Sequence, residues 1–302
     1  MPLIKNATIV IPTLNAEKRL GPILKRLTQA FDPEDIVVVD SSSQDGAPEI
    51  AKSFHCRLLT IAKKDFDHGR TRNLGAGAVK KELIIFMTDD ALPESAETLV
   101  QLLRPFEDPS IAATYARQLP RPEADPLERF ARVFNYPPEP RLQSKESLPQ
   151  WGIKTFFCSD SCAAYRRTTF EALGKFPEPC PVSEDMYMAA KIILAGYKVR
   201  YTPEASVIHS HPLPLAKQFH RYFNIGRFFE REKWILEQAP LTSEGLRFLG
   251  AEARYLWEEG SFLSLPLVVS DAAARYLGLK LGMNHRHIPS WILPRLFPPL
   301  KN

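Results

Sequence analysis

The first half of the chain alternates between short apolar runs and stretches that carry apolar residues at helical spacing. The short runs, rich in β-branched residues, predict buried strands. They are Ala7–Ile11, Ile36–Val39, Arg57–Ile61 and Leu83–Met87. The stretches between them predict helices over 20–31, 48–52 and 70–80. Largely apolar strands that alternate with helices indicate an α/β fold, with a mostly parallel sheet covered by helices on both faces.

The second half follows a less regular pattern. Residues 136–150 hold four prolines and many polar residues, which predicts a long surface loop between the two halves. Ser183 is expected to cap a helix that ends before Gly196. Extended segments are expected over 156–165, 199–201 and 206–208. From Leu215 onward the pattern is helical and rich in aromatic residues, which predicts a helical C-terminal extension.

Composition places the chain among globular proteins. Of its 302 residues, 44% are hydrophobic and 25% are charged, and the formal net charge is +4. These values argue against a disordered, collagen-like or coiled-coil chain. The four cysteines lack the Cys-x-x-Cys pairing of a zinc site and are too few for a disulfide scaffold. Free thiols in a reducing compartment are the simplest interpretation.

Positive charge is concentrated near the C-terminus. Residues 213–302 hold 12 Lys+Arg and 8 Asp+Glu, and after Asp271 five basic residues and no acidic one follow. A basic, apolar segment predicts contact with an anionic surface such as a membrane, and a solubilising face is the alternative. We find no signal peptide, and Ser264 and Pro266 interrupt the apolar stretch 262–269. We therefore expect a cytoplasmic protein, at most peripheral to a membrane.

Polar side chains follow three of the predicted strands. They lie at Thr13 to Glu17, at Asp40 to Asp45 and at Thr88-Asp89-Asp90. In parallel α/β sheets ligands bind beyond the carboxyl ends of the strands, so these clusters are expected to converge. The paired acids at 89 and 90 suit a divalent cation that also binds phosphate oxygens, and a solvated turn is the alternative.

Two further patterns allow a catalytic or a structural interpretation. Glu184 and Asp185 lie in the first turn of a predicted helix, where acids stabilise the helix dipole and where one of them could also act as a general base. His209 and His211 occupy alternate positions at a strand end and point to the same side, where they could ligate a metal. No phosphate loop, dinucleotide fingerprint or Gly-x-Ser-x-Gly elbow is present.

In this order, the motifs resemble the inverting nucleotide-sugar glycosyltransferases of family 2, which have the GT-A fold. The matching segments are Ile11–Glu17, Val38–Gly46, Thr88–Asp90, Glu184-Asp185 and Val207–His209. Other segments are similar to the rhamnosyltransferase branch, which transfers L-rhamnose from dTDP-L-rhamnose in making bacterial surface polysaccharides. These are Phe66–Asn73, Thr88–Pro93, Phe157–Arg167, His209–His211, Arg221–Gly226 and Tyr276–Gly282. Arg70 departs from the branch, where we expect a small residue, and this leaves the donor sugar open.

The resemblance implies a domain organisation. A GT-A domain is expected over 1–212, with a nucleotide half over about 1–105 and an acceptor half over about 106–212. The helical, basic segment 213–302 is expected to contact a membrane, to form a homodimer or to cover the catalytic domain.

The resemblance also implies roles for individual residues. Nucleotide binding is expected from Thr13, Glu17, Asp40, Arg72 and Asp89. A Mg²⁺ or Mn²⁺ ion is expected on Asp90 and His209, with His211 in reserve. Asp185 is the expected general base, and Glu184, Ser159 and Asp160 are expected to bind the acceptor or support the site.

The implied partners are a nucleotide-sugar donor and a saccharide or lipid-linked saccharide acceptor, and no nucleic acid. Three alternatives remain at this point: a family 2 transferase that uses another donor such as a UDP-hexose, a nucleotidyltransferase, and a scaffold that binds glycan or lipid without catalysis. The nucleotidyltransferase would need a glycine-rich, Arg-containing loop after the first strand, where this chain has Pro12-Thr13-Leu14-Asn15. Intact Asp90, Asp185 and His209 argue against the scaffold.

Overall fold

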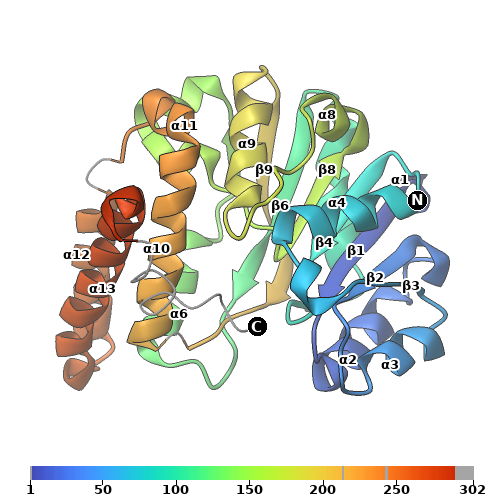
Figure 1. Ribbon diagram of the computed structural model, residues 1–302, viewed down its shortest axis with the longest axis horizontal. Coiled ribbons are helices and arrows are strands. Elements are labelled where there is room, and N and C mark those ends of the chain that lie inside the picture. The colour runs from blue at the N-terminus through green and yellow to red at the C-terminus, as the bar shows by residue number, and fades with distance from the viewer. Residues whose placement is uncertain (1, 213, 242–243, 290–302) are drawn as a thin grey trace. The chain divides into compact units, whose positions relative to one another are not determined.

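The computed structural model of the protein describes residues 2–212, 214–241 and 244–289 (Figure 1). The chain forms two compact units. The sheet unit comprises residues 1–121 and 136–210, and the helical unit comprises residues 122–135 and 211–302. Residues 122–135 thus belong to the helical unit, although sequence analysis places them in the acceptor half of the first domain.

The first four strands form a parallel half-sheet, as predicted. β1 (Ala7–Thr13) lies between β2 (Ile36–Asp40) and β4 (Leu83–Met87), and β3 (Arg57–Thr60) pairs with β2. β1, β2 and β4 are almost wholly buried, because helices cover both of their faces. The carboxyl ends of these strands therefore share one edge, where the polar clusters of the sequence lie.

The other five strands make the sheet mixed. β8 (Cys162–Arg166) runs antiparallel between β4 and β6 (Ile111–Leu119), and β6 is parallel to β9 (Lys198–Ile208). β5 (Leu92–Pro93) and β7 (Arg141–Gln143) pair antiparallel with β9. Because β8 is antiparallel, the loop before it reaches the same edge as the ends of β4 and β9.

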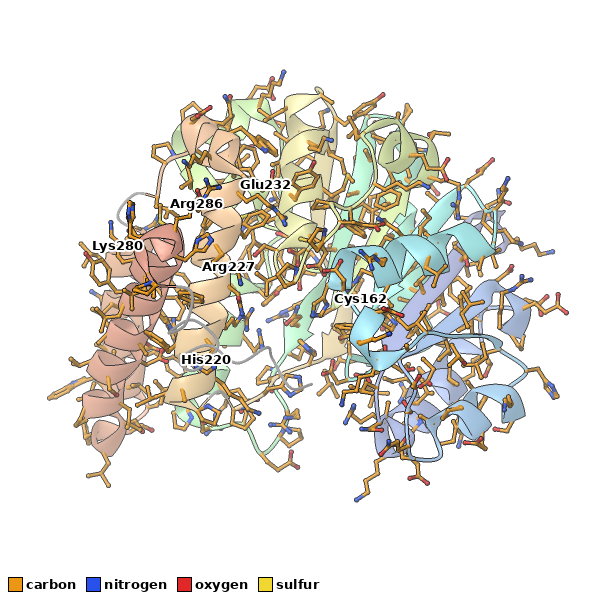
Figure 2. The ribbon with its side chains drawn as sticks, in the orientation of Figure 1. Cys162, His220, Arg227, Glu232, Lys280 and Arg286 are labelled. Atoms are coloured by element: carbon orange, nitrogen blue, oxygen red, sulfur yellow. The ribbon has the colours of Figure 1, made fainter. Side chains whose placement is uncertain are left out.

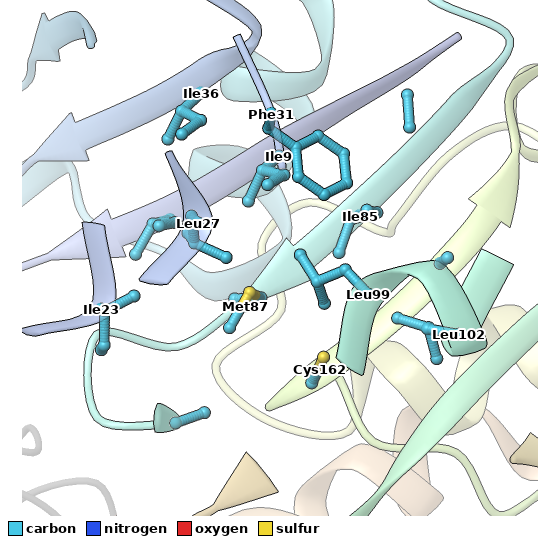
Figure 3. Close-up of a cluster of buried hydrophobic side chains, with 14 of the residues drawn as sticks. Ile9, Ile23, Leu27, Phe31, Ile36, Ile85, Met87, Leu99, Leu102 and Cys162 are labelled. Carbon is cyan, nitrogen blue, oxygen red and sulfur yellow. The ribbon is translucent and has the colours of Figure 1, made fainter. Parts of the chain in front are cut away.

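Helices flank the sheet, and most of them bury an apolar face. In the sheet unit they are α1 (Pro2–Lys5), α2 (Glu17–Leu27), α3 (Ala47–Ser53), α4 (His68–Ala78), α5 (Thr98–Leu103), α7 (Leu148–Trp151), α8 (Arg167–Ala172) and α9 (Glu184–Leu194). Ile23 and Leu27 of α2 pack with Ile9 and Ile85 of the sheet in the main hydrophobic core (Figure 3). Burial of such side chains stabilises the fold by about 1.5–3 kcal/mol each.

Three local predictions need correction. The expected surface loop 136–150 contains β7 and α7, because the side-chain amide of Gln143 donates to the carbonyls of Thr155 and Phe157 and ties this polar segment to the protein. Ser183 precedes α9 as expected, but its φ is +65° and, among the described residues, its side chain makes no capping hydrogen bond. The expected strands 199–201 and 206–208 are one strand, β9.

The helical unit comprises five helices among the described residues. They are α6 (Pro126–Asn135), α10 (Leu215–Arg231), α11 (Lys233–Gln238), α12 (Glu244–Glu258) and α13 (Leu265–Met283). α10 and α13 approach closely where Gly226 faces Gly282, since a Cβ on Gly282 would lie 2.0 Å from the carbonyl oxygen of Phe223. Glycine at this crossing therefore lets the two backbones pack against each other.

The apolar stretch that begins at Phe262 is not interrupted in the way the sequence suggests. Pro266 lies in the first turn of α13, where proline is tolerated, and Ser264 precedes that helix. The continuous helical segment Phe262–Met283 is long and apolar enough to cross a membrane by length and composition, which is weak evidence for a span. The predicted interruption of this apolar stretch at Ser264 and Pro266 is therefore wrong.

Gly75 and Gly77 of α4 offer a matched test of helix packing. A Cβ on Gly75 would lie 2.3 Å from Cγ1 of Val10, whereas a Cβ on Gly77 has open space. We expect Gly75→Ala to lower the free energy of unfolding by about 1–3 kcal/mol through overpacking. Gly77→Ala should raise it by up to about 1 kcal/mol through helix propensity. Urea unfolding of both variants measures this, and equal effects would contradict the packing of α4 on β1.

Candidate active site

Thr13 and Asp40 end neighbouring strands and lie side by side. They are register partners of β1 and β2, and each is 2% exposed. The Thr13 hydroxyl donates to Oδ1 of Asp40 over 3.4 Å, and the Ser43 N–H donates to Oδ2 over 3.0 Å. Glu17 begins α2 nearby, and its own N–H donates to Asp45 over 2.9 Å. The structure thus brings these three predicted nucleotide-binding residues to one edge of the sheet, with the Asp40 carboxylate fixed in orientation.

The two acids of the turn after β4 contact different groups. Oδ2 of Asp89 accepts from the Arg19 guanidinium over 3.1 Å and from the Leu14 N–H over 3.4 Å. Burial, followed by the charge of Asp90, raises the pKa of Asp89, and Arg19 opposes that rise. Oδ1 of Asp90 instead lies 3.2 Å from Nε2 of His209. Asp89 is therefore held against α2, whereas Asp90 faces the end of β9.

Asp90 and His209 form the core of a candidate metal site. Together with His211, two residues further along the chain, they offer ligand atoms that all lie within 4.8 Å of one another. His209 is 13% exposed and Asp90 is 23% exposed at the side chain, whereas His211 is exposed. One carboxylate and one or two imidazoles fit Mn²⁺ or Mg²⁺, because diphosphate oxygens can complete the oxygen-rich shell that these ions prefer.

The predicted general base begins α9. Glu184 is buried, whereas Asp185 is half-buried and hence accessible. Oδ1 of Asp185 accepts from the Met186 N–H over 2.7 Å, and Oδ2 accepts from the Asp160 N–H over 3.3 Å. Desolvation, followed by the charge of Glu184, raises the pKa of Asp185 to about 7. A carboxylate with such a pKa can accept a proton near neutral pH.

Arg72 lies among these carboxylates. It is 3% exposed, with one guanidinium nitrogen 3.0 Å from Glu184 and another 3.8 Å from Asp160. Burial opposes its charge, but Glu184 and Asp160 outweigh burial and raise the pKa of Arg72. The same guanidinium contacts Nδ1 of His68 at 3.0 Å, and burial followed by Arg72 lowers the pKa of that imidazole. Arg72 therefore neutralises buried acids in this structure, and its expected contact with the diphosphate stays a prediction.

The loop Ser159-Asp160-Ser161 connects the metal candidates to Asp185, the predicted base. The Thr88 N–H donates to the Ser161 carbonyl over 3.2 Å, and the Asp160 N–H contacts Asp185 as described above. The Ser159 hydroxyl accepts from the Gln118 side chain over 2.8 Å. Ser159 and Asp160, predicted to bind the acceptor or to support the site, thus have supporting contacts.

Sequence reasoning missed three residues of this network. His68 and Tyr165 lie inside the matched segments without an assigned role, yet His68 contacts Arg72 and the Tyr165 hydroxyl donates to Asp160 over 2.6 Å. Gln118 lies outside every matched segment and contacts both His209 and Ser159. Pairing of β6 with β9 brings it there, and no local pattern in the sequence indicates that pairing.

The model of the family described as "Glycosyl transferase family 2" matches residues 8–174. The chain belongs to glycosyl transferase family 2. The matched range includes Thr13, Asp40 and the Thr88–Asp90 turn, and Asp185 and His209 lie beyond it. Membership in this family makes the protein a glycosyltransferase, as the motifs predicted.

Two relatives, 39% and 40% identical to this chain, match nearly its whole length. The O-antigen chain rhamnosyltransferase WbaN of Salmonella anatum is 39% identical over 289 residues, which span 93% of this chain and 90% of that protein. The O-antigen chain rhamnosyltransferase RfbN of Salmonella typhimurium is 40% identical over 286 residues, which span 93% and 91%. These similarities confirm the predicted relation to the rhamnosyltransferase branch.

Solved structures share the fold. The mannosyltransferase PcManGT from Pyrobaculum calidifontis, in complex with GDP-Man and Mn²⁺, superposes with a TM-score of 0.65 at 17% identity, covering 93% of this chain and 88% of that one. Glucosyl-3-phosphoglycerate synthase from Mycobacterium tuberculosis, with Mn²⁺ and UDP, gives a TM-score of 0.55 at 12% identity, covering 80% and 82%. These likenesses show the fold alone and confirm the expected fold class.

Arg72 and Arg70 give a matched pair of arginine substitutions. Arg72→Met leaves Glu184 and Asp160 buried without their cation, and we expect a loss of about 3–5 kcal/mol in the free energy of unfolding. Arg70 pairs with Glu178 at 3.4 Å, and both side chains are at least 40% exposed. Arg70→Met should therefore change that free energy by no more than about 1 kcal/mol. Comparable losses in denaturant unfolding would contradict the structural role of Arg72.

Proposed function

We propose that this glycosyltransferase transfers L-rhamnose from dTDP-L-rhamnose to a saccharide acceptor in the synthesis of a cell-surface polysaccharide. The observation that carries the proposal is the similarity, at 39% and 40% identity over 93% of the chain, to two O-antigen chain rhamnosyltransferases. Arg70 leaves the donor sugar open to test, and a UDP-hexose is the alternative donor.

The carboxyl edge of β1 and β2 supplies the proposed nucleotide site. Asp40, fixed by Thr13 and Ser43, accepts a hydrogen bond from the N3–H of the pyrimidine. Glu17, at the start of α2, holds the ribose. Asp89, held by Arg19, lies beside this edge through its contact with the Leu14 N–H.

Asp90 and His209, with His211 in reserve, would hold Mg²⁺ or Mn²⁺ in the proposed complex. Bound there, the ion stabilises the negative charge that develops on the departing nucleoside diphosphate. Asp90 lies in the turn between β4 and β5, and His209 follows β9, which pairs with β5. The pairing of β5 with β9 therefore holds the two side chains next to each other.

Asp185 performs the proton transfer of the proposed reaction. Its carboxylate takes the proton of the acceptor hydroxyl as that oxygen bonds to the anomeric carbon. The bond from this carbon to the diphosphate oxygen breaks, and its electron pair leaves with dTDP. Attack opposite the leaving group inverts the anomeric configuration. The raised pKa of Asp185, about 7, supports this role because it matches a neutral working pH.

The helical unit supports a further proposal about location. Large apolar side chains of α12, α13 and the turn between them are strongly exposed: Leu246, Trp257, Phe262, Leu263, Leu267, Val269, Tyr276 and Leu277. Lys280 of α13 lies 5.9 Å from the ring centroid of Tyr276, and Arg286, which follows α13, pairs with Glu230 at 2.9 Å (Figure 2). Apolar and aromatic side chains beside basic ones favour an anionic lipid surface. We propose peripheral contact with the cytoplasmic face of the inner membrane; the aromatic residues expected at 291–297 lie outside the described residues.

The donor and the metal can be tested together. Purified protein is incubated with dTDP-L-rhamnose, UDP-glucose or UDP-GlcNAc and with lipid-linked saccharides as acceptors, and release of the nucleoside diphosphate is measured. We expect release of dTDP from dTDP-L-rhamnose, its loss in excess EDTA and its recovery with Mn²⁺, because Asp90 and His209 suit a diphosphate-bound cation. Turnover of a UDP-sugar alone would contradict the donor proposal, and full activity in EDTA would contradict the metal proposal.

Asp185→Asn tests the base. We expect the transfer rate to fall by about 10²–10⁴-fold while donor affinity is retained, because the amide cannot accept a proton. In the wild type the rate should rise with pH through the raised pKa of about 7.

The pH dependence of the free energy of unfolding serves as the control for Asp185→Asn. Ionisation of Asp185 destabilises the native state between its ordinary pKa of 3.8 and its raised pKa of about 7, so the wild type loses stability as the pH rises through this window. The Asn variant should lack this loss and be the more stable protein at pH 8. Full activity of the Asn variant, or loss of donor binding with unfolding, would reject Asp185 as the base.

Liposome sedimentation tests the membrane proposal. The double substitution Leu263→Glu with Val269→Glu places charge on side chains that are 97% and 69% exposed, and should abolish binding to anionic liposomes. Leu74→Glu, on α4 of the sheet unit at a side chain that is 46% exposed, is the control and should keep it. Absence of wild-type binding, together with a concentration-dependent dimer that the double substitution disrupts, would favour a contact between copies instead.

A further inference from the structure

Gln118 reaches the candidate metal site from the neighbouring strand. It lies on β6 beside Val207 of β9, two residues before His209, and it is 3% exposed. Its side-chain oxygen lies 2.9 Å from Nδ1 of His209. Its side-chain nitrogen donates to the Ser159 hydroxyl over 2.8 Å. Both polar atoms of the buried Gln118 amide are therefore in contact with a partner. The oxygen contacts His209, the candidate metal ligand, and the nitrogen contacts Ser159, in the loop that also contacts Asp185.

This arrangement selects one tautomer of the imidazole. A neutral imidazole carries one N–H, and an amide oxygen can only accept a hydrogen bond. When a cation lies between Nε2 and Asp90, Nδ1 therefore carries the hydrogen and donates it to Gln118, and Nε2 keeps its lone pair for the ion. Nε2 is the nitrogen that faces Asp90, at 3.2 Å. A lone pair at this position is what a divalent cation requires of an imidazole ligand.

The hydrogen bonds of Ser159 favour the orientation in which the Gln118 oxygen faces His209 and the Gln118 nitrogen faces Ser159. Its hydroxyl accepts from Gln118 and donates to the Ser161 hydroxyl over 3.4 Å, so its hydrogen points away from Gln118. A reversed amide would present its NH₂ group to Nδ1 and would move the imidazole hydrogen to Nε2. His209 would then donate to Asp90, and the two side chains would form a closed hydrogen-bonded pair in place of a metal site.

We propose that Gln118 is the positioning residue that fixes the tautomer of His209 and thereby makes its Nε2 a metal ligand. The inference rests on the proposed metal dependence and adds to it a residue outside every motif that carries the resemblance in the sequence analysis. Partners of this kind hold the far nitrogen of metal-bound histidines, and their loss lowers metal affinity by about 10–100-fold.

Metal affinity is the first readout. Mn²⁺ is titrated into the full-length protein in the presence of dTDP, and free Mn²⁺ is measured by electron paramagnetic resonance. Gln118→Met removes the acceptor at similar volume and should weaken Mn²⁺ binding by about 10–100-fold. Gln118→Glu keeps an acceptor for the Nδ1 hydrogen and should retain binding.

Gln143→Met is the matched control for loss of a buried glutamine. Gln143 is 1% exposed, and its amide donates to the backbone carbonyls of Thr155 and Phe157. This variant should lower stability and leave Mn²⁺ affinity unchanged. An equal loss of affinity in both Met variants would assign the effect to weakened structure and overturn the proposal.

The tautomer itself is the second readout, and it is recorded with diamagnetic Mg²⁺ and dTDP, because without a cation the Asp90 carboxylate, 3.2 Å from Nε2, favours a hydrogen on that nitrogen. Long-range ¹H–¹⁵N spectra of protein with ¹⁵N-labelled histidine are recorded at pH 8, and His209→Asn assigns the resonances. We expect the Nδ1–H tautomer at His209 in the wild type and in Gln143→Met, and the Nε2–H tautomer or a mixture in Gln118→Met.

The two readouts separate this inference from the proposed function. If the wild type binds no Mn²⁺, the proposed metal dependence fails, and the assignment of Nε2 as a metal ligand fails with it. If the wild type and Gln118→Met bind Mn²⁺ equally and show the same tautomer, the role of Gln118 is overturned while the metal dependence stands.

Discussion

The antiparallel placement of β8 between β4 and β6 is the constraint on which the candidate site depends. A parallel strand in that position would begin at the opposite edge of the sheet, whereas β8 begins beside the end of β4, with Cys162 paired to Met87. The loop Ser159-Asp160-Ser161 therefore lies at the edge where the Thr88–Asp90 turn and His209 emerge. Hydrogen bonds from this loop reach the turn after β4, the Gln118–His209 pair and the first turn of α9.

The carboxylates around that loop outnumber the cations that contact them. One buried guanidinium, Arg72, serves Asp160 and Glu184, while Asp185 beside them depends on two backbone N–H groups. Desolvation, and after it the charge of Glu184, leaves Asp185 with a raised pKa. Functional sites commonly contain such perturbed groups, because a base must be held in an environment that disfavours its charged form.

More of the fold than of the candidate site could be predicted from the sequence. Apolar runs such as Ile36–Val39 predict strands, because a strand that is buried on both faces is apolar along its length. Polar residues follow each strand because the chain reverses direction there. Motifs such as Thr88-Asp89-Asp90 indicated the chemistry. The partners of those residues depend on contacts distant in sequence: Arg72 with Glu184, and Gln118 with His209, are 112 and 91 positions apart. A pattern within one window cannot reveal either pair, and the strand β7 was missed because a polar segment with four prolines carries no strand signal.

The central claim is that one edge of the sheet assembles a metal-dependent sugar-transfer site from Asp90, His209 and Asp185. Anomalous diffraction from crystals of the full-length protein grown with Mn²⁺ and dTDP tests it most directly. The account predicts one Mn²⁺ peak within bonding distance of Asp90 and of Nε2 of His209, with the pyrimidine against Asp40 and the Asp185 carboxylate free of metal. A peak on Asp185 or Asp89 instead, or dTDP bound away from the ends of β1 and β2, would contradict it.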